Sequence, residues 1–203
     1  MRKIGLLLGS FDPITIGHSH MISCVLNSKL CDEVMLVVAK QNPWKHDDST
    51  DFNIRCEMAI AAVMQRFDYK VSVCFAERDI EPPTYSYKVL DKIRKAHKND
   101  ELYIICGSDV YEKIEYWKEF ETKIKPFFKF IHITRGKDAV DGKNLFEVED
   151  FKDDNGKVTA TIRTKVVDIS SSMVRQLIHE GLNPFPYITY ETYNIIKHYK
   201  LYG

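Results

Sequence analysis

The chain lacks an excess of charge of either sign. Its 203 residues include 29 Lys and Arg and 29 Asp and Glu, so the formal net charge is zero. Proteins that bind nucleic acid or membrane surfaces through non-specific charge contacts are usually basic overall. The balance therefore predicts neither kind of partner, and any positive field that holds a phosphate must be local.

Long apolar runs and paired cysteines are also missing. No run approaches the about 20 apolar residues that a membrane helix needs, and residues 1–9 are too short for a secretory signal. The five cysteines form no Cys-x-x-Cys pair, which predicts reduced, structural thiols. Neither a cluster of metal-ligating residues nor an internal repeat is visible. We therefore expect a cytoplasmic protein without a metal site of its own.

What the sequence does contain is an alternation of strand-like and helix-like segments. Apolar runs of strand character lie at Ile4–Leu8, Glu33–Ala39, Val71–Phe75, Glu101–Cys106 and Phe127–Ile133. Helical spacing is found at His18–Asn27, Asn53–Phe67, Tyr85–Ala96 and Asp109–Phe120. The alternation predicts an α/β fold, a doubly wound parallel sheet with helices on both faces, in one domain spanning residues 1–203. Ligands of such sheets bind at the carboxyl ends of the strands, which places Gly9, Gly107 and Arg135 on one rim.

The alternation breaks after the fifth predicted strand. A turn signal at residues 154–156, Asp-Asn-Gly, separates Phe146–Phe151 from Val158–Val167 and predicts a β-hairpin insertion near residues 137–168. A helix from Ser171 to Glu180 and a last helix from Thr189 to Tyr199 are predicted to follow.

The first segment with chemical character joins the first strand to the first helix. Residues 9–18 read GSFDPITIGH. Gly9 permits a tight turn and a close approach of the backbone to a ligand, and exposed amides before a helix N-terminus bind anions. His18 would point its imidazole at the bound group, although a simple turn capped by His18 has the same pattern. The common GxxxxGK[ST] and GxGxxG fingerprints are absent.

The second such segment opens the helix near residue 171. Residues 169–175 read ISSSMVR, so three consecutive serines offer hydroxyls and amides to an anion. Arg175 follows Ser172 by three residues and projects from nearly the same face of the helix. The alternative is an ordinary N-cap followed by a surface arginine.

These two segments resemble the T/H-x-G-H and ISS(T/S)xxR signatures of the nucleotidyltransferase superfamily. The resemblance implies that His18 binds the α-phosphate under attack and that Ser172 and Arg175 hold the β- and γ-phosphates. Thr15 stands where the nicotinate enzymes of the superfamily often carry His; its hydroxyl can donate to a phosphate but carries no charge. The implied ATP-binding residues are Gly9, Ser10, Phe11, His18, Gly107, Asp109, Ser170, Ser171, Ser172 and Arg175.

A third set of residues resembles the bacterial-type nicotinate mononucleotide adenylyltransferases. It consists of Pro43-Trp44-Lys45, Arg55 with Met58, the segment Thr84–Leu90, the group Gly107, Asp109 and Trp117, and Arg135-Gly136. The resemblance implies that Asp109 accepts hydrogen bonds from the ribose of ATP, that Trp117 stacks on the pyridine ring and that Lys45 meets a phosphate. The implied catalytic residues are His18, Arg175, Thr15 and Lys45, and the implied mononucleotide-binding residues are Ser10, Phe11, Lys45, Thr84, Tyr85, Ser86, Trp117 and Arg135. Ordinary alternatives exist, because Trp117 could be a core residue, Lys45 part of a solvated loop and Tyr85 a packing residue at a helix start.

The implied reaction transfers AMP from ATP to nicotinate or nicotinamide mononucleotide, releasing pyrophosphate and forming the dinucleotide in NAD biosynthesis. A phosphate monoester has a second pKa near ~6, so the attacking oxygen is already ionised at neutral pH and needs no general base. Catalysis would then consist of positioning and charge stabilisation. Mg²⁺ is expected with the ATP, held by phosphate oxygens and water.

Other members of the superfamily offer competing readings. Pantetheine-phosphate adenylyltransferases match residues 9–18 and 169–175 equally well, but the Thr84–Leu90 segment and the set containing Trp117 favour a pyridine mononucleotide. A class I aminoacyl-tRNA synthetase fragment would need a KMSKS-like loop and an RNA-binding surface, and neither is present. A non-catalytic nucleotide sensor of the same fold is disfavoured because His18 and Arg175 are both present. The sequence leaves open the choice between nicotinate and nicotinamide and the oligomeric state, a homo-oligomer included.

Overall fold

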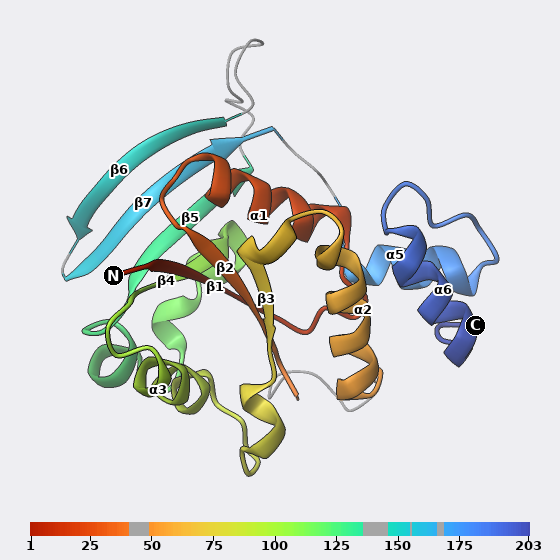
Figure 1. Cartoon of the computed structure of the whole chain (residues 1–203), viewed down its shortest axis with the longest axis horizontal. Coiled ribbons are helices and arrows are strands. Elements are labelled where there is room, and N and C mark those ends of the chain that lie inside the picture. The colour runs from red at the N-terminus through yellow and green to blue at the C-terminus, as the bar shows by residue number, and fades with distance from the viewer. Residues whose placement is uncertain (41–48, 136–145, 155, 166–168) are drawn as a thin grey trace.

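A mostly parallel sheet organises the molecule. The computed structural model describes residues 1–40, 49–135, 146–154, 156–165 and 169–203. Within this part of the chain the sheet has seven strands in the order β3-β2-β1-β4-β5-β7-β6 (Figure 1). The strands are β1 (Lys3–Gly9), β2 (Glu33–Val38), β3 (Val71–Cys74), β4 (Glu101–Gly107), β5 (Lys129–Arg135), β6 (Phe146–Asp154) and β7 (Lys157–Thr164). All neighbours pair in parallel except β6, which is antiparallel to β7. The predicted doubly wound α/β fold is confirmed.

Helices cover both faces of this sheet. The helices are α1 (Ile16–Asn27), α2 (Phe52–Met64), α3 (Ser86–Ala96), α4 (Ser108–Tyr111), α5 (Ser171–His179) and α6 (Tyr190–Tyr199). Of these, α5 and α6 lie to one side of the sheet, with α6 against α2 (Figure 1). Figure 1 shows α1 and α3 on opposite sides of the central strands. Among the described residues no helix combines the length and the apolar character needed to cross a lipid bilayer.

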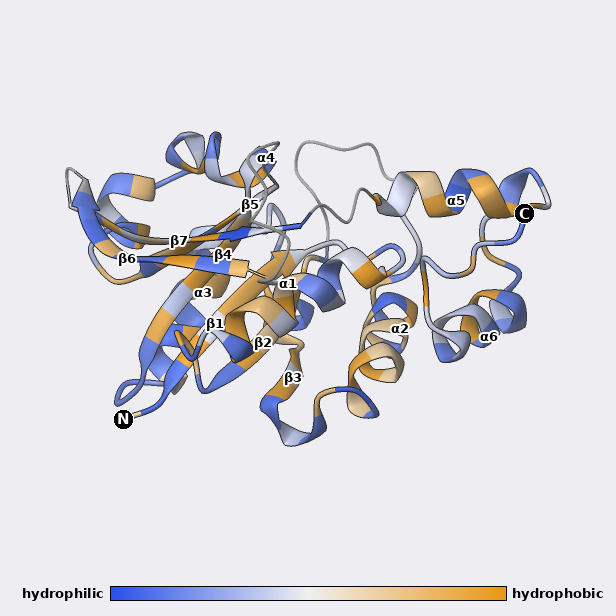
Figure 2. Ribbon diagram, turned by 90° about the horizontal axis from the view of Figure 1, so that it is seen from above, coloured by the Kyte–Doolittle hydropathy of each residue, from blue (hydrophilic) through white to orange (hydrophobic). Residues whose placement is uncertain are grey.

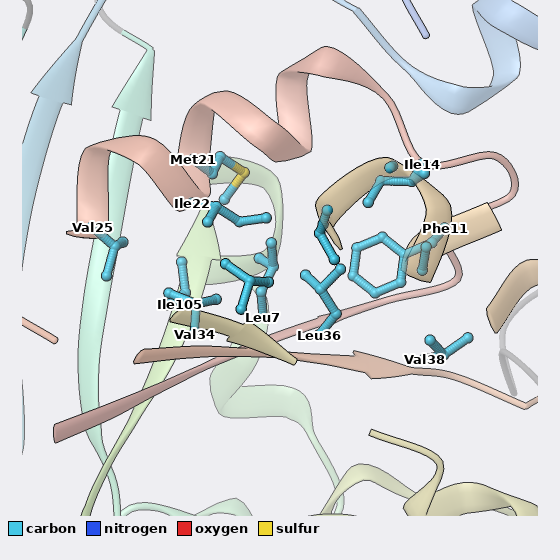
Figure 3. Close-up of a cluster of buried hydrophobic side chains, with 14 of the residues drawn as sticks. Leu7, Phe11, Ile14, Met21, Ile22, Val25, Val34, Leu36, Val38 and Ile105 are labelled. Atoms are coloured by element: carbon cyan, nitrogen blue, oxygen red, sulfur yellow. The ribbon is translucent and has the colours of Figure 1, made fainter. Parts of the chain in front are cut away.

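The strands read as unbroken apolar runs because both of their faces are buried. Side chains alternate along a strand, so Leu7 of β1 enters one core while Ile4 and Leu6 enter the other. Figure 2 shows the resulting concentration of apolar residues along the central strands. The first core lies beneath α1, and Figure 3 shows residues of α1 and of the preceding loop over residues of the strands: Met21, Ile22 and Val25 above Leu7, Val34, Leu36 and Ile105, with Phe11 and Ile14 alongside. This packing fixes the loop before α1 above the ends of the strands.

The predicted helix Asp109–Phe120 is wrong. The chain forms the short α4, a 3₁₀ turn η3 (Ile114–Tyr116) and a π-helical segment η4 (Phe120–Ile124) instead. Trp117 has extended backbone angles of φ −66° and ψ 138°, and Glu119 is left-handed at φ 59°, so no helix runs through them. The segments η3 and η4 still bury Ile114, Phe120 and Ile124, whose spacing resembles that of a continuous helix.

The predicted hairpin is present, but it belongs to the main sheet. β6 and β7 pair antiparallel around a turn in which Gly156 has φ 78°, and β7 pairs in parallel with β5. The hairpin therefore extends the sheet by two strands and is not a separate insertion. From the end of β7 the chain leads toward Ile169 and α5, while residues 166–168 lie outside the described part.

Candidate active site

The carboxyl ends of three neighbouring strands form the rim of the site. Gly9 ends β1, Gly107 ends β4 and Arg135 ends β5. The pairing of Leu7 with Ile105, and of Gly107 with Ile133, places these ends at the same edge of the sheet. The predicted rim is confirmed for the backbone. Lys45 and Gly136 lie outside the described residues, so the role of Lys45, like that of the Arg135 side chain, stays a prediction.

At the start of α1, Thr15 and His18 cap the helix together. The Thr15 backbone N–H donates to Nδ1 of His18 at 3.0 Å, and the Thr15 hydroxyl lies 3.0 Å from the same nitrogen. Because Nδ1 accepts the amide hydrogen, the proton of the neutral ring is on Nε2. His18 is therefore both a helix cap and a ring whose Nε2–H group is a hydrogen-bond donor, and Thr15 sets that arrangement.

Phe11 contributes its ring to the core. Its side chain is 2% exposed and lies within the first core in Figure 3. A Cβ on Gly9 would come within 3.1 Å of this ring, which explains the glycine at the end of β1. The edge of the ring also meets His18, with centroids 5.1 Å apart. Only the backbone of Phe11 is thus left to fulfil its predicted contact with a ligand.

The start of α5 packs directly on the loop before α1. Ser171 donates to the carbonyl of Pro13 at 2.8 Å, and Nη1 of Arg175 donates to the carbonyl of Asp12 at 2.6 Å. The other nitrogen, Nη2 of Arg175, donates to Oγ of Ser172 at 3.2 Å. Residues 9–18 and 169–175, far apart in the sequence, therefore form one site.

Two further details shape this junction. A Cβ on Gly17 would come within 3.0 Å of the Ile169 side chain, so the glycine permits α5 to approach α1 closely. Ser170 is the N-cap of α5, and its hydroxyl accepts the Met173 N–H at 3.1 Å. The positive ends of two helices, Arg175 and the His18 Nε2–H consequently occupy one region. Such a region suits a ligand with several negatively charged phosphate groups.

Arg55 holds the loops beneath this region, a role that the sequence did not reveal. Its side chain is 1% exposed, and its guanidinium donates at 2.6 to 2.9 Å to the backbone carbonyls of Ser10, Ala39, Lys40 and Thr50. Burial lowers the pKa of this guanidinium, and the Asp12 carboxylate partly opposes the change. The match of Arg55 to a family motif marked the position, but nothing local identified its carbonyl partners.

The segment predicted to hold the mononucleotide divides into buried and accessible parts. Thr84 is buried and its side chain hydrogen-bonds Glu77, whose carboxylate also accepts the Lys40 N–H at 2.6 Å. Burial raises the pKa of Glu77. The Thr84 side chain therefore supports a loop, and its contact with the mononucleotide stays a prediction. Tyr85 and Ser86 are partly exposed, and the ammonium of Lys118 lies 4.4 Å from the centroid of the Tyr85 ring.

Asp109 and Trp117 differ in exposure. Asp109 is exposed in the first turn of α4, directly after Gly107 on the rim, as a ribose-binding carboxylate would be. Trp117 is partly buried and packs against the core on the α3 side of the sheet. The core-packing alternative for Trp117 is thus partly right, and its stacking on a pyridine ring stays a prediction.

His132 and Tyr111 anchor α4 to the sheet. The two rings stack in parallel with centroids 4.1 Å apart, and Nε2 of His132 lies 3.3 Å from the Ser108 hydroxyl. The Tyr111 hydroxyl donates to Oγ1 of Thr159 on β7 at 3.0 Å. Burial lowers the pKa of His132. The sequence gave no sign of this contact, because His132 sits inside an apolar strand.

A separate hollow lies at the opposite edge of the sheet. A cavity of about 570 Å³ is lined by the end of α3 and by the first residues of β4 and β5. Three of its lysines, Lys95, Lys125 and Lys129, are paired with acids, as in the 3.2 Å contact between Lys129 and Glu101. The phosphate-binding features all lie at the other edge, so we assign the active site to the rim.

The fold and the rim are those of a nucleotidyltransferase, and the chain belongs to the cytidylyltransferase-like family, whose model matches residues 6–177. A curated relative from Clostridium tetani, named "Probable nicotinate-nucleotide adenylyltransferase", is 30% identical over 203 residues, which is the full length of both chains. Nicotinic acid mononucleotide adenylyltransferase of Plasmodium falciparum complexed with NaAD matches with a TM-score of 0.78 and 26% identity. The same enzyme complexed with APC gives 0.76 and 25%. Both matches cover 100% of this chain and 98% of the Plasmodium falciparum chain. The resemblance predicted from the sequence is confirmed.

Proposed function

We propose that the chain is an adenylyltransferase that transfers AMP from ATP to nicotinate mononucleotide, forming the dinucleotide and pyrophosphate in NAD biosynthesis. The observation that carries this proposal is the pair of contacts by which Ser171 and Arg175 of α5 hold the loop that leads to His18. They bring together, at one rim of a nucleotidyltransferase fold, the two segments to which we assign phosphate binding. The full-length relatives in the preceding section are adenylyltransferases of nicotinate nucleotides by name, which supports the choice of acceptor.

The geometry suggests a role for each residue in the reaction. A phosphate oxygen of the mononucleotide forms a bond to the α-phosphorus of ATP, and the bond from that phosphorus to the β-phosphate oxygen breaks. Nε2–H of His18 donates to the α-phosphoryl oxygens as their charge shifts, while Arg175 and Ser172 hold the departing pyrophosphate. The attacking oxygen is ionised at neutral pH because its second pKa is near ~6, so no side chain has to remove a proton.

Mg²⁺ is proposed to arrive with the nucleotide. Among the described residues there is no group of three or more His, Cys, Asp or Glu side chains that could hold a metal ion. Mg²⁺ commonly keeps water and substrate phosphates as ligands, so it can bind with ATP without a cluster of protein ligands. The ion supplies further charge neutralisation on the triphosphate, and we assign it no protein ligand.

The cysteines support a cytoplasmic location. All five, Cys24, Cys31, Cys56, Cys74 and Cys106, are unpaired thiols, and four of them are buried. Burial raises the pKa of Cys31 to about 12, so this thiol stays protonated and unreactive. Such thiols need no oxidising compartment.

The decisive experiment offers ATP and Mg²⁺ with three acceptors in separate reactions. These are nicotinate mononucleotide, nicotinamide mononucleotide and 4′-phosphopantetheine. The rate is measured by pyrophosphate release, and the product is identified by mass spectrometry. We expect the fastest turnover with nicotinate mononucleotide. Arg175→Ala should abolish most of the rate, whereas Lys98→Ala at the far edge of the sheet should not change it. Preferential adenylylation of phosphopantetheine, or no turnover with any acceptor, would refute the proposal.

A further inference from the structure

Asp12 is a buried carboxylate in the middle of the loop before α1. It is 6% exposed, and it forms no ion pair with a Lys, Arg or His side chain among the described residues. Instead, Oδ1 accepts the Tyr202 hydroxyl at 2.5 Å and Oδ2 accepts the Thr50 N–H at 3.3 Å. The Thr50 hydroxyl in turn donates to the Tyr202 oxygen at 3.2 Å. A buried charge is tolerated only when it is hydrogen-bonded in this way, so these contacts hold Asp12 in place.

The end of α6 directs Tyr202 toward this carboxylate. The Leu201 N–H donates to the Ile196 carbonyl at 3.0 Å and the Lys200 N–H to the Lys197 carbonyl at 3.3 Å, which is the Schellman pattern of a helix end. Lys200 adopts the left-handed conformation of that motif at φ 52°. The chain thereby turns back, and Tyr202 packs against the first core. Tyr202 is part of a built contact and not of a loose tail.

Asp12 connects Tyr202 to Arg175 of α5. Its carbonyl oxygen accepts Nη1 of Arg175 at 2.6 Å, while its side chain is held by Tyr202. On the other side of the contact, Nε of Arg55 donates to the Thr50 carbonyl at 2.7 Å. A shift of the Asp12 carboxylate would therefore displace the carbonyl that orients the Arg175 guanidinium.

We infer that Tyr202 is a positioning residue for the pyrophosphate end of ATP, acting on Arg175 through Asp12. This inference rests on the proposed function, since it assigns Arg175 to the leaving group. Tyr202 takes part in no proton transfer. Burial and the neighbouring Asp12 carboxylate raise the pKa of its hydroxyl, so the hydroxyl stays protonated and donates at physiological pH.

The test removes one hydroxyl at a time from the two tyrosines at this end of the chain. Tyr202→Phe removes the donor to Asp12. Tyr199→Phe is the matched control, because the Tyr199 hydroxyl donates to the exposed Glu57 carboxylate at 3.2 Å, away from the rim. We expect Tyr202→Phe to lower kcat/KM for ATP by about tenfold while KM for nicotinate mononucleotide changes by less than about twofold. Tyr199→Phe should behave as the wild type.

A second comparison separates positioning from general support. In an Arg175→Ala background, Tyr202→Phe should not lower kcat/KM for ATP any further, because the arginine on which Tyr202 acts is gone. The inference would be overturned if Tyr202→Phe weakened the use of ATP and of nicotinate mononucleotide equally and also lowered the Tm. It would also be overturned if the effects of Tyr202→Phe and Arg175→Ala on kcat/KM for ATP were fully additive. Indistinguishable kinetics of the Tyr202→Phe and Tyr199→Phe variants would overturn it as well.

Equilibrium binding of ATP without any acceptor keeps the two proposals apart. A wild type that binds ATP but adenylylates no acceptor contradicts the proposed function. The selective loss of ATP affinity in Tyr202→Phe would still report on the contact with Asp12. Conversely, if the wild type is active and Tyr202→Phe changes neither ATP affinity nor turnover, only the inference about Tyr202 is contradicted.

Discussion

The two nitrogens of His18 have separate tasks. Nδ1 is used by the Thr15 backbone amide at 3.0 Å, which orients the ring and leaves the proton on Nε2. A capping residue and a phosphate-binding residue are usually considered as alternatives, yet the proposed function gives one imidazole both roles. Thr15 accordingly acts through His18. This role needs no charged side chain, so threonine can stand where the nicotinate enzymes often carry His.

Substitutions that imitate one nitrogen at a time test this division. We expect His18→Ala to lower kcat by about 10² to 10³, because a donor to the reacting phosphoryl is lost, with little change in ATP affinity. Gln reaches the Nε2 position with an amide N–H, whereas Asn reaches only the region of Nδ1. His18→Gln should therefore keep more activity than His18→Asn in steady-state assays. Near wild-type turnover of the Ala variant, or an Asn variant better than Gln, would contradict the assignment.

Residues with local patterns could be predicted from the sequence, and residues with distant partners could not. His18 and Arg175 stand within short motifs whose neighbours supply amides and hydroxyls. Arg55 bonds carbonyls of two different loops, and Tyr202 reaches Asp12 across 190 positions, so neither leaves a periodic or local signal. The contact of Thr84 with Glu77 could not be predicted for the same reason, since Glu77 lies in a separate turn.

At the scale of elements, the strands were predictable and the connections after β4 were not. A strand buried on both faces reads as an apolar run whatever its neighbours are. The stretch from α4 to η4 consists of three short segments that together bury only Ile114, Phe120 and Ile124, and its breaks at Trp117 and Glu119 involve no proline or glycine. Only tertiary packing against the sheet defines its path.

The end of α6 offers a stability test at this scale. Lys200 occupies a left-handed position that normally favours glycine. Lys200→Gly should raise the free energy of unfolding by about 0.5 to 1 kcal/mol, because strain at this residue is relieved. Lys197→Gly within the same helix is the control and should lower it by about 1 kcal/mol. Chemical denaturation measures both, and destabilisation by Lys200→Gly would show that the left-handed turn carries no strain.

At the scale of the whole molecule, His132 couples folding to pH. Burial favours its neutral form, and the groups that face it are Ser108, Tyr111 and Glu112 of the α4 region together with Lys157 of β7. The folded pKa is lowered, so the unfolded chain binds the proton more readily. Stability from this residue is present above the unfolded value of about 6.5 and is lost as the pH falls toward the folded pKa.

Unfolding by denaturant between pH 7.5 and pH 5.5, about one unit on either side of the unfolded value, measures this loss. We expect the wild type to lose stability across that interval and His132→Gln to show a flatter dependence. His179→Gln, at the exposed end of α5, should keep the wild-type dependence. An identical slope for wild type and His132→Gln would mean that another group controls the effect.

The joining of residues 9–18 to residues 169–175 and then to Tyr202 also bears on biosynthesis. The ribosome delivers the first segment long before the others, and the intervening strands can begin to pair during translation. The contact between Tyr202 and Asp12, however, forms only after α6 has left the exit tunnel. Under the proposed function, a nascent or truncated chain without α6 has the whole sheet but lacks this contact, so it should bind ATP more weakly than the finished molecule.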